Sequence, residues 1–275
     1  MITGITGIIS DLSLYRRLIG MQLRTQVQYK VNLAVDIFTY FLVTMLEYMV
    51  IFLYFNTFQT LLGWHVGEVA LLGAVVSFTF GLAELFGSGL DSFSEIIRRG
   101  EFDRILLRPV GALMQVASNE FRMRRLGRMT QGLLMFLFAL HLLPALHWTF
   151  AKLLMLVFGI ASGATIFVAV LLLGATLCFW TVETTELANI LTYGGREVMS
   201  WPLSVYNRAF QSIFLFVVPL AFGLYMPVCY LLGRPQPLGL PDAAAFLSPL
   251  AAALFAAVAY VFWRFGVRRY QSAGG

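Results

Sequence analysis

The sequence predicts an all-α membrane protein that crosses the bilayer six times, and three observations lead to this fold class. Of the 275 residues, 59% are hydrophobic and only 12% are charged, against about 25% charged residues in an ordinary soluble domain. The apolar residues form runs long enough to cross the hydrocarbon core, which takes about 20 residues of helix. Basic residues are concentrated in alternate connections between these runs. The sequence therefore predicts one transmembrane domain, residues 1–275, without a separate soluble domain.

The first expected element is an amphipathic helix over residues 8–30 that lies along the membrane surface. Its apolar residues recur every three or four positions, and arginines occupy other parts of the helix circumference. A soluble helical tail is the alternative interpretation. The apolar positions are Ile8, Leu12, Tyr15, Ile19, Leu23 and Val27.

Six apolar runs are expected to form the transmembrane helices. They cover residues 33–55, 66–90, 129–146, 153–180, 209–232 and 243–263. All but Lys152 and Arg234 of the 19 Lys and Arg residues then fall on one side of the membrane. Because positively charged loops stay in the cytoplasm, both termini, the connection 91–128, Arg196 and Arg208 are predicted to be cytoplasmic.

This charge distribution also bears on partners and location. The formal net charge of +5 is explained by membrane topology, so no nucleic-acid partner is predicted. The bilayer is the expected surrounding of the chain, as a multi-pass protein of the plasma membrane or the bacterial inner membrane.

Two patterns predict how the later helices pack and connect. Gly159 and Gly163 form a G-x-x-x-G spacing that allows two helix backbones to approach closely, and we expect packing within the chain rather than dimerisation. Residues 233–248 contain three prolines, Pro235, Pro237 and Pro241, which disfavour a continuous helix. This stretch is expected to form a short folded loop or a re-entrant hairpin.

The chain lacks the residues that hydrolyse ATP or cleave peptides. A P-loop needs a lysine preceded by glycine and followed by Ser or Thr, whereas Lys30 follows Tyr29 and Lys152 follows Ala151. An intramembrane protease could use only the serine of residues 87–89, which is predicted to lie a bilayer thickness from the histidines. The chain is therefore predicted not to be an enzyme, and to hold no cofactor or metal.

The connection 91–128 contains the most informative stretch of the sequence, residues 95–109. Charges of both signs alternate with apolar side chains there, which is typical of a short helix that presents apolar anchors and a polar rim to a protein partner. A lipid surface would favour basic residues alone. The alternative is a solvated loop whose arginines only fix the topology.

Two tracts carry a family resemblance. The first is Gly-Glu-Phe-Asp at 100–103, followed by Leu-Leu-Arg-Pro at 106–109. The second runs from Trp-Pro-Leu-Ser-Val-Tyr at 201–206 through Phe-Val-Val-Pro-Leu-Ala-Phe at 216–222 to Leu-Leu-Gly at 231–233. In this order the tracts resemble the permease subunits of type-2 ATP-binding-cassette exporters. Asn207 departs from the pattern, because members of this branch often have proline there.

The resemblance implies that two permease subunits, identical or paralogous, form a pathway above two separate ATPase subunits that bind ATP and Mg²⁺. Residues 95–109 would be the coupling helix, which transmits closure of the ATPase. Phe102, Asp103, Arg104 and Arg108 are the contacts carried over from the family. The full predicted contact set is Ile97, Arg98, Arg99, Glu101, Phe102, Asp103, Arg104, Leu106 and Arg108.

Carboxylates inside the predicted spans support either a pathway or a packing role. A charge at mid-bilayer costs about 2.5 to 3.5 kcal/mol, so Glu47 must find a partner, become protonated or face a polar cavity. Glu47 and Glu84 are predicted to belong to the translocation pathway, with interhelical hydrogen bonding as the alternative role. An ion-coupled transporter or channel that uses Asp36, Glu47 and Glu84 is the alternative function. Lipids, lipid-linked glycans, peptides and natural products are all compatible cargoes.

Overall fold

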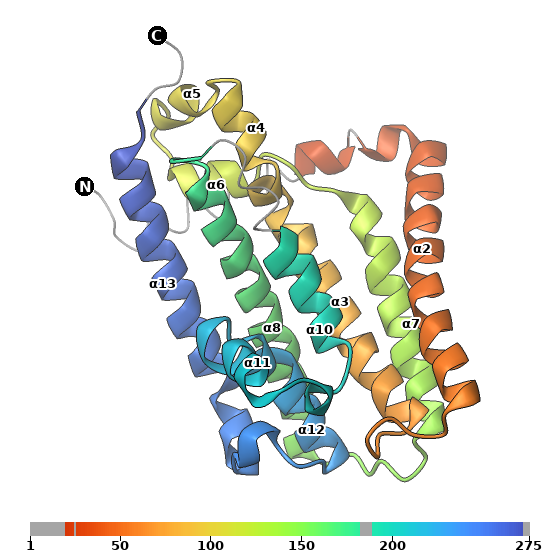
Figure 1. Ribbon diagram of the computed structural model, residues 1–275. Coiled ribbons are helices and arrows are strands. Elements are labelled where there is room, and N and C mark those ends of the chain that lie inside the picture. The colour runs from red at the N-terminus through yellow and green to blue at the C-terminus, as the bar shows by residue number, and fades with distance from the viewer. Residues whose placement is uncertain (1–19, 25, 182–188, 272–275) are drawn as a thin grey trace.

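The computed structural model describes residues 20–24, 26–181 and 189–271, which are almost entirely helical (Figure 1). The long helices are α2 (Lys30–Thr57), α3 (Val66–Asp91), α7 (Leu126–Leu142), α8 (Phe150–Leu177) and α13 (Ser248–Arg269). The short α-helices are α4 (Phe93–Arg98), α5 (Phe102–Leu106), α6 (Ala112–Ala117), α10 (Gly195–Met199), α11 (Arg208–Ser212) and α12 (Met226–Leu232). Within the described residues, the β-structure consists of one isolated bridge between Leu61 and Trp64.

Short 3-10 and π-helical turns join these elements. The 3-10 turns are η1 (Met123–Arg125), η3 (Leu203–Val205), η6 (Pro237–Gly239) and η7 (Asp242–Leu247). The π-helical turns are η2 (Ile190–Gly194), η4 (Ile213–Val217) and η5 (Ala221–Tyr225).

Four helical stretches of the described chain are long and apolar enough to cross a membrane, which confirms an all-α, multi-pass protein. They are Lys30–Thr57, Val66–Arg98, Phe150–Leu177 and Asp242–Arg269. A fifth span is counted if the bent pair Arg208–Val217 and Ala221–Leu232 is taken as one. Helix α7 has 17 residues and packs against both α2 and α3.

Helix α3 forms the centre of the bundle, with α7 on one side and α8 on the other (Figure 1). In its most apolar stretch 83% of the residues are buried, against 17% in α2 at the edge. Small residues permit this central packing. A side chain at Gly132 of α7 would place its Cβ atom 2.8 Å from the backbone nitrogen of Phe78 in α3.

The G-x-x-x-G pair packs within the chain, as predicted. A Cβ atom at Gly159 would lie 2.8 Å from Cβ of Pro227, and one at Gly163 would lie 2.6 Å from Cδ2 of Leu224. Both glycines of α8 therefore face the segment η5–α12, whose backbone comes close at Gly223.

The stretch 209–232 differs from the single span that hydrophobicity predicts. Its two helical parts meet at an angle of 89° around Pro219. Proline has no backbone N–H to donate and disfavours a helical conformation in the residue before it, and Val218 accordingly leaves the helix with φ −119° and ψ 88°. The break therefore lies within the predicted span rather than in the proline-rich loop after it.

A helical segment that hydropathy did not predict, η2 followed by α10, takes a place inside the bundle against α3 and α8. The chain then continues to α11, which contacts η6 and lies at the opposite end of the molecule from α4 and α5 (Figure 1). This corrects the predicted placement of two arginines. Arg196 is buried inside the bundle, and Arg208, in α11, lies at the end opposite the connection 91–128.

The N-terminal prediction can be followed only in part. Residues 20–24 and 26–28 are helical and lead into α2, whereas Ile8, Leu12, Tyr15 and Ile19 lie outside the described residues.

Candidate coupling hairpin and buried charge network

The segment between α3 and α7 folds into a hairpin of α4 and α5 at one end of the bundle (Figure 1). The turn depends on Gly100, whose φ of +67° is strained for any residue with a side chain. Gln115 of α6 secures the far side of the hairpin. Its Nε2 atom donates to the carbonyl oxygens of Ile105 at 3.0 Å and of Val110 at 2.9 Å.

An aromatic cluster seats this hairpin on the ends of α8 and α13. The Phe102 ring, fully buried, lies 5.3 Å from the ring of Phe93 and 4.9 Å from that of Tyr270, between centroids. Phe179, just after α8, and Trp263 of α13 also contact it, at 5.3 and 6.3 Å. Burying one such side chain stabilises a fold by about 1.5 to 3 kcal/mol. The hairpin is therefore a fixed part of the bundle.

This packing corrects two of the predicted contact residues. Ile97 and Phe102 are only 5% and 0% exposed, so in this structure they hold the hairpin to the bundle and present no surface to a partner. The remaining predicted contacts are accessible at least in part. Arg98, Arg99, Glu101, Arg104, Leu106 and Arg108 are exposed, and Asp103 is half-buried.

The sequence analysis missed the most exposed apolar residue of the hairpin. Leu107 is 86% exposed, against 43% for Leu106. It follows the last residue of α5, where the helix can no longer turn it toward the bundle. The adjacent Leu-Leu pair was the available signal, since two successive residues of a helix cannot face the same side.

The second group of predicted residues contributes to a network of buried charges. The Glu84 carboxylate of α3 forms an ion pair with Nη1 of Arg125 and accepts a hydrogen bond from Nη1 of Arg128, both at 2.7 Å. The hydroxyl of Tyr193 in η2 donates to the same carboxylate at 2.9 Å. Arg125 also donates to the hydroxyl of Tyr40 in α2 at 3.2 Å. Glu84 thus links α3 to the start of α7 and to η2.

Glu47 of α2 is the centre of a second ion pair. Its two oxygens accept from Nη1 and Nη2 of Arg196 in α10, at 2.7 and 3.0 Å. Arg196 also pairs with the neighbouring Glu197. Guanidinium groups bind carboxylates most strongly in this two-bond arrangement, so the pair fixes α2 to α10.

Phe80 of α3 lies between the two groups. The Cζ atom of Arg128 is 5.1 Å from the centroid of its ring, and that of Arg196 is 5.9 Å away. A cation over an aromatic face is attracted by the ring quadrupole. One network therefore joins α2, α3, α7 and the segment η2–α10.

The predicted carboxylates have therefore found partners, although the two do not contact each other. Each pairs with arginines that the topology argument had assigned to cytoplasmic segments. Arg125 and Arg128 are 4% and 6% exposed. Their spacing of three residues at the start of α7, which places them on one helix face, was a signal for this role.

The arrangement suits a mechanical rather than a catalytic role. Buried charges are costly unless they are paired, and pairing them across helices makes the relative positions of those helices specific. In the described residues, no group of three or more His, Cys, Asp and Glu side chains is placed to hold a metal ion.

Comparison with known proteins identifies the family of the chain. A family model described as ABC-2 family transporter protein matches residues 41–274. No curated protein and no solved structure matches the chain. The matched region includes the hairpin, both ion-pair groups and every long helix except the start of α2, and permeases of this family generally pair with ATPase subunits. The chain therefore belongs to the ABC-2 family of transporter proteins, as a multi-pass membrane permease.

Proposed function

We propose that this chain is the transmembrane permease subunit of an ATP-driven exporter, which pairs with a second permease and with two ATPase subunits. The observation that carries the proposal is the α4–α5 hairpin. It projects at one end of the bundle (Figure 1), has a buried aromatic base and exposes charges of both signs beside Leu106 and Leu107. This is the composition of a protein-docking surface with apolar anchors and a polar rim.

The proposed ATPase contacts are the accessible residues of the hairpin. They are Arg98, Arg99, Glu101, Asp103, Arg104, Leu106, Leu107 and Arg108. The aromatic base would pass a displacement of the hairpin directly to the ends of α8 and α13. ATP and Mg²⁺ would be bound by the partner ATPase.

The proposed topology has six spans with both termini in the cytoplasm of a plasma or bacterial inner membrane. It combines the four long helical stretches with α7 and with the part of the chain between α8 and α11, of which η2 and α10 are described. The bent pair η4 and η5–α12 would then enter the membrane from the outer side without crossing it. Irregular backbone at membrane depth is tolerated where it is buried in protein, as this segment is against α8.

Glu47 is proposed to lie at the wall of the pathway, and Glu84 to support it from within the bundle. The Glu47 side chain is 36% exposed, whereas that of Glu84 is 5% exposed. An ion-coupled transporter is the weaker alternative, because a cation would first have to displace Arg196 or two further arginines from these carboxylates.

A charge reversal at the hairpin tests the coupling role. The double variant Asp103→Arg with Arg104→Asp keeps the net charge, yet presents the wrong sign at each position. We expect it to abolish the stimulation of ATP turnover that the permease gives its ATPase in proteoliposomes. Lys152→Gln, at the opposite end, is the control. Normal assembly and normal coupled turnover in the double variant would refute the proposal.

Labelling tests the orientation independently. The native Cys178 and Cys229 are buried, so a cysteine introduced at Glu101 would be the accessible thiol. An impermeant thiol reagent should modify it in inside-out vesicles and leave it unmodified in intact cells. Labelling in intact cells would place the hairpin outside and end the proposal.

A further inference from the structure

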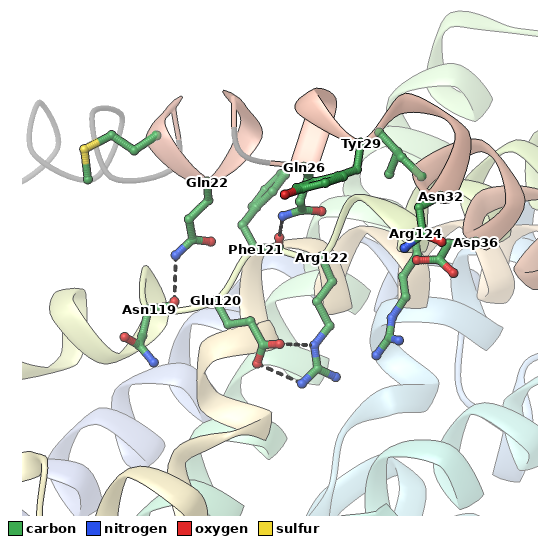
Figure 2. Close-up of a pocket in the computed structure, with 12 residues that line it drawn as sticks. Gln22, Gln26, Tyr29, Asn32, Asp36, Asn119, Glu120, Phe121, Arg122 and Arg124 are labelled. Carbon is green, nitrogen blue, oxygen red and sulfur yellow. Dashed lines mark hydrogen bonds and ion pairs between the residues drawn. The ribbon is translucent and has the colours of Figure 1, made fainter.

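A cavity of about 680 Å³ lies between the N-terminal helical segment and the residues that lead into α7. Figure 2 shows Gln22 and Asn119 at one end of it and Asn32, Asp36 and Arg124 at the other. Its size is within the range of small-ligand sites. The proposed function leaves this cavity without a role.

Hydrogen bonds to backbone atoms frame the cavity. Nε2 of Gln22 donates to the carbonyl oxygens of Ser118 at 2.9 Å and of Asn119 at 2.6 Å. Gln26 donates to the carbonyl of Phe121 and accepts from the backbone nitrogen of Met123 at 3.0 Å. Two glutamines one helical turn apart thus hold the N-terminal segment against an extended stretch of backbone, and the space beside them stays open.

Two of the four charged lining residues neutralise each other. Arg122 donates to both oxygens of Glu120, at 2.6 and 2.8 Å (Figure 2). Burial raises the pKa of Glu120, but hydrogen bonds with Arg122 and Ser92 and the positive charges of Arg122 and Arg124 outweigh burial and hold this pKa below its usual value. Nη1 of Arg122 also forms an ion pair with Oδ2 of Asp91, at 3.6 Å.

Asp36 and Arg124 are left as one negative and one positive group at the same end of the cavity. Figure 2 draws no hydrogen bond or ion pair from either of them to another lining residue. Arg124 lies over the ring of Tyr40, at 5.4 Å from its centroid. Its Nε atom is buried and has no hydrogen-bond partner among the described residues. That atom is closed off from the cavity, so it is the charge of the Arg124 guanidinium, together with the Asp36 carboxylate, that this end of the cavity offers to a ligand.

We infer that this cavity binds the headgroup of a zwitterionic phospholipid, with the phosphate at Arg124 and the ammonium at Asp36. The cavity lies at the N-terminal end of α2, where the candidate span begins, and this is the depth of lipid headgroups. Met21 and Tyr29, which are 60% and 67% exposed, form an apolar and aromatic margin of the kind found at membrane interfaces. A headgroup with a primary amine satisfies both charged residues. Glycerol headgroups lack the cation, and choline headgroups lack an N–H donor.

Lipid retention tests this inference on the full-length chain. The protein is reconstituted in nanodiscs with equal amounts of dioleoyl phosphatidylethanolamine, phosphatidylglycerol and phosphatidylcholine, and lipids retained on transfer to detergent are identified by native mass spectrometry. We expect phosphatidylethanolamine to be enriched about fivefold over each of the others, the factor that one partly exposed ion pair supplies. Equal retention of the three lipids would overturn the inference.

Single variants test the separate roles of the Asp36 and Arg124 charges in lipid binding. Asp36→Asn should remove the preference for phosphatidylethanolamine, and Arg124→Gln should lower retention of all three lipids. Asp242→Asn and Arg208→Gln make the same charge changes outside the cavity and should retain lipids as the wild type does. Arg124→Lys keeps the cation and should preserve most binding, which separates loss of charge from loss of fold. Unchanged retention in both cavity variants would refute the site.

A competition experiment identifies the source of the headgroup. Soluble glycerophosphoethanolamine has the same phosphodiester and ammonium charges without acyl chains, so it should displace the lipid only at far higher concentration. Displacement at concentrations equal to those of the lipid would assign the cavity to a soluble zwitterion and overturn the lipid assignment.

Discussion

Glu47 and Arg196 form a two-bond ion pair between α2 and α10, with N–O distances of 2.7 and 3.0 Å, although 149 positions separate them in the sequence. The guanidinium is buried while the carboxylate is partly open, with side-chain exposures of 5% and 36%. A pair of this kind connects the interior of the bundle to the face that we propose lines the pathway.

A double-mutant cycle measures this connection. Glu47→Gln and Arg196→Gln should be coupled by about 0.5 to 3 kcal/mol, the range for residues in one ion-pair network. The measurement is thermal unfolding in detergent of both single variants and the double variant. The cycle of Glu197→Gln with Arg196→Gln is the control, because Glu197 is 57% exposed and its coupling should be smaller. Equal coupling energies in both cycles would contradict the conclusion that Glu47 is the main partner of Arg196.

Removing the Glu84 carboxylate should be the most damaging change in the network. Glu84→Gln leaves the buried Arg125 and Arg128 without their negative partner, which costs about 3 to 5 kcal/mol. The thermal unfolding midpoint should fall accordingly. Glu101→Gln is the matched control on the exposed hairpin, where changes stay within about 0.5 kcal/mol. Similar midpoints for the two variants would mean that the network contributes little to stability.

The two apolar sides of the hairpin should respond differently to truncation. Phe102→Ala removes the centre of the aromatic base and should destabilise the protein by about 3 to 5 kcal/mol. Leu107→Ala removes an exposed side chain and should change stability by less than about 0.5 kcal/mol, while weakening co-purification of the ATPase. Unfolding and pull-down are measured on the same samples. An ATPase yield unchanged by Leu107→Ala would remove this residue from the docking surface.

The Glu120–Arg122 pair predicts a dependence of stability on pH. Its partner holds the folded-state pKa of Glu120 below the ordinary 4.5, so the folded state binds the proton less readily than the unfolded state. The stabilisation of the fold by this ion pair is complete above pH 4.5 and is lost as the pH falls through the lowered pKa of Glu120.

The unfolding midpoint of the wild type should therefore exceed that of Glu120→Gln at neutral pH, and the difference should shrink as the pH falls from 4.5 through the folded-state pKa. A difference that stays constant across this range would show that the effect of the substitution is steric.

Hydrophobicity alone predicted the helical class and the location of the long helices, because bilayer thickness imposes a minimum length on any span. It missed the segment η2–α10. Arg196 and Glu197 interrupt that run, and a count of apolar residues cannot register that the arginine is paired with Glu47. It also treated 209–232 as one span, since hydropathy averages over a backbone break such as the one at Pro219.

The docking residues were predicted from composition and from the family resemblance, neither of which distinguishes the two sides of a hairpin. Phe102, which was predicted as a contact, and Leu107, which was not, are both large apolar residues in the sequence. Their different surroundings depend on Trp263 and Tyr270, far along the chain, which cover one of them and leave the other in the open. Neither hydrophobic periodicity nor sequence motifs can predict packing between such distant parts of the chain.

The base beneath the hairpin also constrains the order in which the protein matures. A ribosome completes Phe102 long before it reaches Trp263 and Tyr270, and a nascent chain that lacks α13 cannot close the aromatic cluster. The hairpin can pack in its final position only when the last helix has been synthesised and inserted. Under the proposed coupling role, an ATPase would therefore meet a finished docking surface only on a finished permease.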